Sequence, residues 1–157
     1  MSSNNTIGLK KASASQVAKK LNELLANYQI FYMNVRGYHW NVKGRQFFQL
    51  HEKFEELYTD LLTKVDEVAE RILTLGHQPV HAYSDYVKIA KIQEDKNVQD
   101  GETCVRGVLQ GYQVLIELQR ELLSLASNAE DEGTAAQAGD YIREQEKTVW
   151  MLTSHLS

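Results

Sequence analysis

Four residues between positions 51 and 70 have the side chains and the spacing to bind a metal ion. His51 and Glu55 stand four residues apart, and so do Asp66 and Glu70. On a helical wheel with His51 at zero, the other three fall at about 40°, 60° and 100°. The four side chains therefore share one arc of a helix. Imidazole and carboxylate groups without a thiolate suit iron, manganese or zinc.

These residues lie beside an apolar stripe that predicts one long helix from about Arg45 to Leu75. The stripe repeats every three or four residues over about eight turns. Its members are Phe47, Leu50, Phe54, Leu57, Leu61, Val65, Val68, Ile72 and Leu75. Gly76 is well placed to end the helix. A single acid on such a helix is usually a solvated surface residue, but two matched pairs favour a metal site.

One helix cannot bring both pairs to the same ion, because Glu55 and Asp66 are about 16 Å apart along its axis. A second, antiparallel copy removes this difficulty. With a two-fold axis near residues 60 and 61, His51 faces Glu70 of the other copy. Glu55 then faces Asp66, since the residue numbers of both pairs add to the same total. A two-fold axis repeats each contact, so two such sites form at the interface.

His39 and Trp40 stand at the end of another helix, predicted from about Ser15 to Trp40, for which Ser13 or Ser15 can provide the cap. His39 can add a further imidazole to the proposed site. Trp40 has two interpretations, a residue that fills the core or a redox-active ring beside a metal. The sequence alone leaves both open.

The composition indicates one all-α domain. The chain has 157 residues, one proline, nine glycines and 43% hydrophobic residues, which favours long helices. Its net charge of −4 provides no general attraction for nucleic acid or anionic lipid. Cys104 is the single cysteine, which excludes an intrachain disulfide, and we expect it to be buried or half-buried. Without a membrane-length apolar run or a signal core, we expect a cytoplasmic protein.

The remaining periodic segments complete a bundle. A long connection over 77–99 contains a short predicted helix at Ser84–Ala90. Two long helices follow, from about Asp100 to Ser127 and from about Gly133 to His155, with Trp150 expected in the core. Four long helices predict a four-helix bundle with one long crossover. The sequence has no Glu-x-x-His motif, which argues against a di-iron centre within one chain.

Two charged segments each have two interpretations. Residues 1–12 are small and polar and are predicted to form a flexible tail before a bundle domain at 13–157. The lysines of this region are a solvated surface or, less simply, a contact for DNA phosphates. The acidic turn is formed by Glu130, Asp131 and Glu132. It can stabilise the start of the last helix, which is the simpler interpretation, or line a cation pore in a symmetric shell.

Several motifs together resemble the Dps family, the mini-ferritins named as DNA-binding proteins from starved cells. They are HW at 39–40, LHEKFEELY at 50–58, DEVAERI at 66–72 and EQEKTVWML at 144–152. The resemblance covers nearly the whole chain past the tail. It implies a ferritin-like four-helix bundle with a short extra helix in the crossover between helices two and three. It also implies a hollow dodecamer built from two-fold dimers.

The resemblance further implies a ferroxidase centre with two iron ions at each two-fold interface. The matching ligands are His39, His51 and Glu55 from one subunit and Asp66 and Glu70 from the other. The residue matching Glu55 is often aspartate in this family. Trp40 matches an aromatic residue that accepts electron equivalents beside the centre. The acidic turn, chiefly Asp131 and Glu132, lies where iron enters the shell through pores.

The implied function is oxidation of Fe(II), preferably by hydrogen peroxide, and storage of Fe(III) as a mineral that protects the cell from oxidative damage. A nucleoid DNA-binding protein is the alternative. We hypothesise weak or no DNA binding, because the tail is short and a shell multiplies the net charge of −4. A purely structural helical dimer is the third possibility. Ferrous iron titration separates it from a ferroxidase, since such a dimer has no saturable oxidation.

Overall fold

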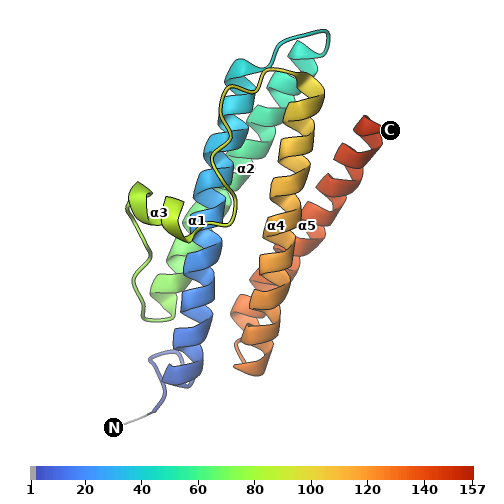
Figure 1. The fold of residues 1–157 in the computed structure, drawn as a ribbon. Coiled ribbons are helices and arrows are strands. Elements are labelled where there is room, and N and C mark those ends of the chain that lie inside the picture. The colour runs from blue at the N-terminus through green and yellow to red at the C-terminus, as the bar shows by residue number, and fades with distance from the viewer. Residues whose placement is uncertain (1–2) are drawn as a thin grey trace.

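The computed structural model describes residues 3–157, which form five helices and no strand (Figure 1). Their bounds are α1 Lys11–Asn41, α2 Phe47–Thr74, α3 Tyr83–Ile89, α4 Gly101–Asn128 and α5 Glu132–Leu156. The predicted all-α four-helix bundle with a short extra helix in the crossover is therefore confirmed.

The long helices form two antiparallel pairs, α1 with α2 and α4 with α5 (Figure 1). α1 also packs against α4 and α3. The crossover at 75–100 runs back along the bundle, so that α4 starts at the same end as α2. The two helices on either side of the crossover therefore run parallel, as a long connection allows.

The chain before α1 folds back on itself in a turn. The Asn5 side-chain oxygen accepts hydrogen bonds from the backbone N–H groups of Ile7 at 3.2 Å and Leu9 at 2.9 Å. The backbone N–H of Lys11 donates to the Ser3 carbonyl at 2.9 Å. An asparagine that bonds the backbone two residues on is a common way to make such a turn.

The first helix consequently begins earlier than the sequence predicted. Residues 11 and 12 of the predicted tail are helical, and residues 1 and 2 lie outside the described part. Ser13 and Ser15 were wrong as caps, because both lie inside α1. Lys10 occupies the cap position and makes no side-chain capping bond. The preceding turn sets the start of α1, which helix-capping patterns alone do not show.

The end of α2 follows the sequence prediction closely. Gly76 has a φ of +87°, a left-handed conformation that glycine adopts without strain. Its N–H donates to the carbonyl of Leu73 at 2.9 Å, and that of His77 donates to the carbonyl of Ile72 at 3.1 Å. These two bonds define a Schellman motif, which satisfies the last carbonyls of the helix.

The predicted apolar stripes form the core, but Trp150 lies outside it. Cys104 is buried, as expected, at the start of α4. Trp150 was predicted to be core and is 64% exposed. Gln145 and Leu152 are the buried residues nearest to it on α5. At 100° per residue they place Trp150 on roughly the opposite side of the helix.

A closed ring of hydrogen bonds links three helices inside the core. The Tyr28 hydroxyl donates to Gln119, and the Gln119 amide donates to Gln145 at 2.7 Å. The Gln145 amide donates back to the Tyr28 oxygen at 2.8 Å. Burial raises the pKa of Tyr28 well above its ordinary value, so its hydroxyl stays protonated. Neutral groups therefore fill this part of the core, in agreement with the missing Glu-x-x-His motif.

Asparagines on α1 hold the crossover against the bundle. The Asn27 side-chain oxygen accepts from the backbone N–H groups of Lys91 at 3.0 Å and Ile92 at 2.9 Å. The Asn34 oxygen accepts in the same way from Asp95 at 3.0 Å. These bonds satisfy backbone groups of an irregular segment that has no helix or sheet to pair with.

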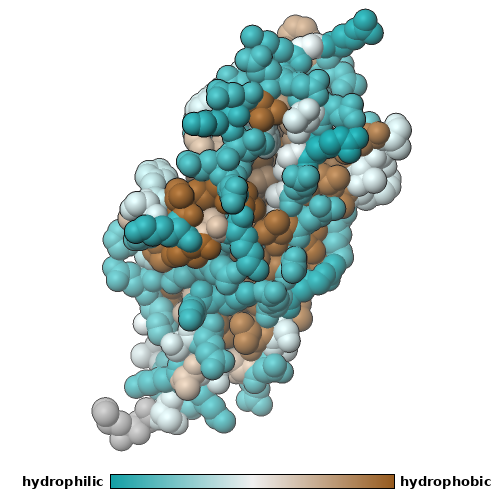
Figure 2. Space-filling view, in the orientation of Figure 1, coloured by the Kyte–Doolittle hydropathy of each residue, from teal (hydrophilic) through white to brown (hydrophobic). Residues whose placement is uncertain are grey.

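The surface is mostly polar, with apolar side chains gathered over α3 (Figure 2). The exposed apolar residues of this helix are Tyr83, Val87 and Ile89. None of the helices within residues 3–157 combines the length and apolar character that a membrane span requires.

Candidate metal centre

His39 and His51 face each other where α1 ends and α2 begins. Their rings are stacked, with centroids 3.8 Å apart and planes 14° from parallel. Nδ1 of His39 lies 2.6 Å from the carbonyl oxygen of His51, and Nδ1 of His51 lies 2.7 Å from that of His39. The short turn over 42–46, which includes Gly44 at φ +120°, brings these two ends together.

This reciprocal pair of bonds determines which ring nitrogens can bind a metal. A carbonyl oxygen only accepts, so each Nδ1 carries the proton and donates it. In the neutral ring, Nε2 then keeps its lone pair as the ligand atom. Nε2 of His39 lies 3.8 Å from a carboxylate oxygen of the exposed Glu55. The chain thus offers two oriented imidazoles beside one carboxylate. Metal-binding histidines commonly donate their other ring N–H to a carbonyl in this way.

Aromatic rings pack along this histidine pair. Phe47 stacks on His51 at 5.0 Å, with the planes 19° apart. On the other side, Tyr58 presents an edge contact to His39 at 5.2 Å and 74°. Tyr32 in turn meets Tyr58 edge-on at 5.8 Å and 88°. The two imidazoles therefore lie within a column of rings from α1 and α2.

Trp40 is 57% exposed, which excludes the interpretation that it fills the core of the single chain. The Arg36 guanidinium lies 5.0 Å from its ring centroid and 5.4 Å from that of Tyr58. Arg36 also donates a hydrogen bond to the Tyr32 hydroxyl at 2.8 Å. A cation between two ring faces is a favourable arrangement that holds both rings in place.

Asp66 and Glu70 are exposed on α2 and do not reach the histidines. Within residues 3–157, their carboxylates make no hydrogen bond or ion pair. The described residues also contain no group of three or more His, Cys, Asp or Glu side chains that could hold a metal ion. One chain therefore divides the five predicted ligands. His39 lies near both His51 and Glu55, whereas Asp66 and Glu70 lie farther along α2.

The acidic turn separates into one buried and two exposed carboxylates. Asp131 is 2% exposed and caps α5 by accepting the Thr134 backbone N–H at 3.0 Å. It also accepts from the Arg71 guanidinium at 2.7 Å. Glu130 and Glu132 are exposed. The capping interpretation thus holds for Asp131, whose charge is paired within the chain.

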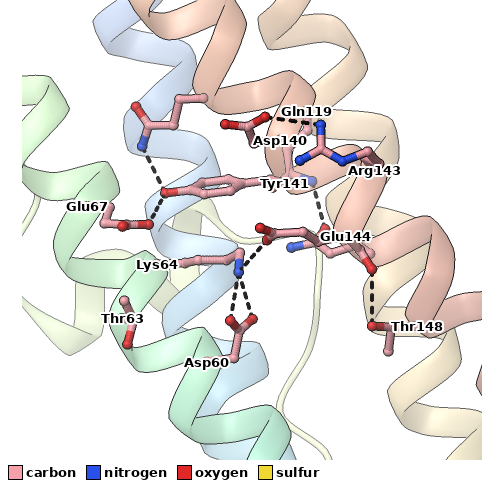
Figure 3. A network of polar contacts seen from close by, with 12 residues as sticks. Asp60, Thr63, Lys64, Glu67, Gln119, Asp140, Tyr141, Arg143, Glu144 and Thr148 are labelled. Carbon is pink, nitrogen blue, oxygen red and sulfur yellow. Dashed lines mark hydrogen bonds and ion pairs between the residues drawn. The ribbon is translucent and has the colours of Figure 1, made fainter.

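Sequence reasoning missed an ionic network around the buried Lys64 on another face of α2 (Figure 3). Lys64 is 4% exposed, and its Nζ lies 2.8 Å from Asp60 and 2.9 Å from Glu144 of α5. It also lies 5.1 Å from the ring of Tyr141, whose hydroxyl donates to Glu67 at 2.7 Å. Burial acts to lower the pKa of Lys64, but the bonds to the two carboxylates outweigh it and raise the pKa. The only available signal was the four-residue spacing of Asp60 and Lys64, which is typical of exposed pairs.

Comparison with known proteins identifies the class first. Residues 18–157 match the family model of the ferritin-like domain. A DNA protection during starvation protein of Porphyromonas gingivalis is 40% identical over 148 residues, covering 94% of this chain and 93% of that protein. An uncharacterized protein of Haemophilus influenzae is 60% identical and covers 95% and 93%.

A solved structure identifies the group within that class. The crystal structure of a Dps protein from Vibrio cholerae O1, described as a ferritin-like diiron-carboxylate protein, has a TM-score of 0.98 and 52% identity. The match covers 100% of this chain and 99% of that one. The chain therefore belongs to the Dps family of ferritin-like proteins.

Proposed function

We propose that this protein is a ferroxidase and iron-storage protein that oxidises Fe(II) at sites shared by two copies of the chain. The division of donors along α2 carries the proposal. His39, His51 and Glu55 supply two oriented imidazoles and a carboxylate at one end of the helix. Asp66 and Glu70 supply further carboxylates nearer the other end, and neither carboxylate has a partner within residues 3–157.

A second, antiparallel α2 completes each set of donors. About an axis between residues 60 and 61, His51 meets Glu70 of the second copy and Glu55 meets Asp66. Two identical sites follow from one interface, because a two-fold axis makes both copies contribute the same surface.

Exposed apolar residues on α2 support the same register. Phe48 is 80% exposed and lies opposite Leu73, which is 58% exposed, in the antiparallel arrangement. Leu62, 50% exposed, lies opposite Thr59 beside the axis. The register was set by the metal-binding residues alone, so the apolar pair of Phe48 and Leu73 supports it independently. Exposed apolar surface of this kind marks a protein interface.

Ferrous iron is the substrate of the proposed reaction, and hydrogen peroxide is the preferred oxidant. Two Fe(II) ions each give one electron to hydrogen peroxide and become Fe(III). The O–O bond breaks, and two protons convert its two oxygen atoms into two water molecules. This two-electron reduction avoids the hydroxyl radical that a single Fe(II) releases. The carboxylates favour the Fe(III) product because they are hard, charged oxygen donors.

We extend the proposal to a hollow shell of twelve copies that stores Fe(III) as an oxide. The close match to Dps structures supports this assembly. Glu130 and Glu132 would line the pores through which iron enters, since they are exposed at the turn between α4 and α5. Asp131 would contribute there as a helix cap. Trp40, adjacent to His39 in the chain, would take part in electron transfer at the site.

DNA binding is the second candidate, because several relatives are named for DNA protection during starvation. Lys10, Lys11 and Lys19 are exposed near the N-terminus. Against strong binding, each chain carries a net charge of −4 and residues 3–10 form a turn instead of an extended basic arm. We expect weak binding at neutral pH. A gel-shift titration that shows tight, steeply salt-dependent binding by the assembled protein would contradict this.

Stopped-flow oxidation of ferrous iron tests the main proposal. The assembled wild-type protein should oxidise added Fe(II) rapidly with peroxide and saturate at two ions per chain. His51→Ala should lose this fast phase, whereas Glu56→Gln should retain it. Glu56 is a suitable control because it is an exposed acid next to Glu55 that pairs with Lys53 instead of a histidine. Equal rates in both variants would refute the site.

A further inference from the structure

Tyr58 contacts one member of the histidine pair, His39, through its aromatic ring. It lies two turns after His51 on α2, and its ring meets His39 edge-on at 5.2 Å. A histidine ring rotates easily about its last side-chain bond, because that torsion has broad minima. The Nδ1 hydrogen bond of His39 fixes one side of its ring, and the Tyr58 ring stands against another.

Tyr58 is itself held by two residues of α1. Tyr32 meets its ring edge-on at 5.8 Å, and the Arg36 guanidinium lies 5.4 Å from its centroid. Arg36 is also bound to the Tyr32 hydroxyl, so the three side chains support one another. Residues 32, 36 and 39 follow one face of α1 at helical spacing. The contact to His39 is therefore made by a ring with little freedom to move.

We propose that Tyr58 is a positioning residue that fixes the His39 ring with Nε2 directed at the iron site before any metal binds. This inference rests on the proposed ferroxidase function. Tyr58 acts through its ring and not through its hydroxyl, for which the structure shows no hydrogen bond within residues 3–157. The histidine half of the site is thus already formed in each chain, and the second copy adds only carboxylates.

The test compares Tyr58→Phe, which keeps the ring, with Tyr58→Leu, which keeps apolar volume but removes the ring edge. Cobalt(II) binding to the assembled protein, followed by its visible absorption, measures the site without turnover. Changing a residue behind a metal ligand typically costs about 10–100-fold in affinity. We expect a loss of about tenfold in Tyr58→Leu and wild-type affinity in Tyr58→Phe. Size-exclusion elution and the melting temperature should stay unchanged in Tyr58→Phe.

Two results would overturn the proposal. One is wild-type cobalt affinity in Tyr58→Leu, and the other is an equal loss in both variants, which would assign the role to the hydroxyl. A crystal structure of metal-free Tyr58→Leu provides a readout independent of metal. A His39 ring in a new orientation supports positioning, and an unmoved ring contradicts it. Failure of the ferroxidase proposal would look different, because cobalt binding would then be insensitive to His51→Ala.

Discussion

Two faces of α2 carry acids in opposite circumstances. On the face toward α5, Asp60 and Glu67 are bonded to Lys64 and Tyr141 within the chain (Figure 3). On the outward face, Asp66 has no partner within residues 3–157. Acids of the first kind belong to a network that joins α2 to α5 through the contacts of Lys64 with Glu144 and of Tyr141 with Glu67. An acid of the second kind is available to a metal ion or to another copy.

Apolar residues on the same helix divide in the same way. Leu57 and Leu61 are buried in the core, whereas Phe48 and Leu73 are largely exposed. Exposed leucine and phenylalanine beside unpaired carboxylates form a surface that is incomplete in one chain. We infer that α2 serves two interfaces, one inside the bundle and, under the proposed function, one between copies. Substitutions can disturb each of these two interfaces separately.

Leu62→Glu should have the largest effect, because it places a carboxylate beside the proposed two-fold axis in both copies. Like charges brought together at an interface cost several kcal/mol, which weakens association by about a thousandfold or more. Light scattering after size-exclusion chromatography should show smaller species, and iron oxidation should fall with assembly. Thr63→Glu is the control, since it adds the same charge to an adjacent exposed position. Intact assembly in Leu62→Glu would refute the register.

Asp131→Ala should destabilise the fold by about 2 kcal/mol, because it removes a helix cap and the partner of a charged Arg71. Chemical denaturation measures this loss. Asp131→Asn keeps the side-chain oxygen for the cap and should lose less. If the two variants are equally stable, the charge of Asp131 has no stabilising role. Like Asp60 and Glu67, Asp131 is an acid with partners inside its own chain.

Lys64→Met should cost about 1–2 kcal/mol at neutral pH, since it removes charged hydrogen bonds to Asp60 and Glu144 while keeping the apolar stem. Folding raises the pKa of Lys64 above 10.5, so the charged lysine stabilises the fold fully below that pH. The contribution disappears as pH rises through the folded-state pKa. Melting curves of both proteins should therefore differ steadily from pH 7 to 9 and converge at higher pH. A difference that grows with alkalinity would contradict this assignment.

The sequence predicted the helices and the shared arc of His51, Glu55, Asp66 and Glu70, because both depend on local spacing. The 3–4 repeat located α2, and the same spacing placed Glu55 and Asp66 on one face. For His39 and His51, the sequence predicted only that the two residues could serve the same site. It did not predict that their rings stack. Their reciprocal bonds depend on how the turn at 42–46 closes, which no periodicity describes.

Other features depend on distant parts of the chain and could not be predicted. Lys64 looks like half of an exposed pair until α5 covers it and adds Glu144. Asp131 looks like one of three equivalent acids until Arg71 approaches it from α2. Trp150 looked apolar and therefore internal, but its side of α5 is free in the single chain. In each case, the packing of a second helix decides the role of the residue.

Co-expression of two inactive variants tests the shared site most directly. His51→Ala and Asp66→Ala should each lack fast ferrous oxidation when expressed alone. In a mixed dimer, one of the two sites combines an intact His51 with an intact Asp66 from the other copy. Random mixing should therefore restore about a quarter of the wild-type fast phase. No recovery in mixed, correctly assembled shells would show that each site belongs to one chain and would contradict the account.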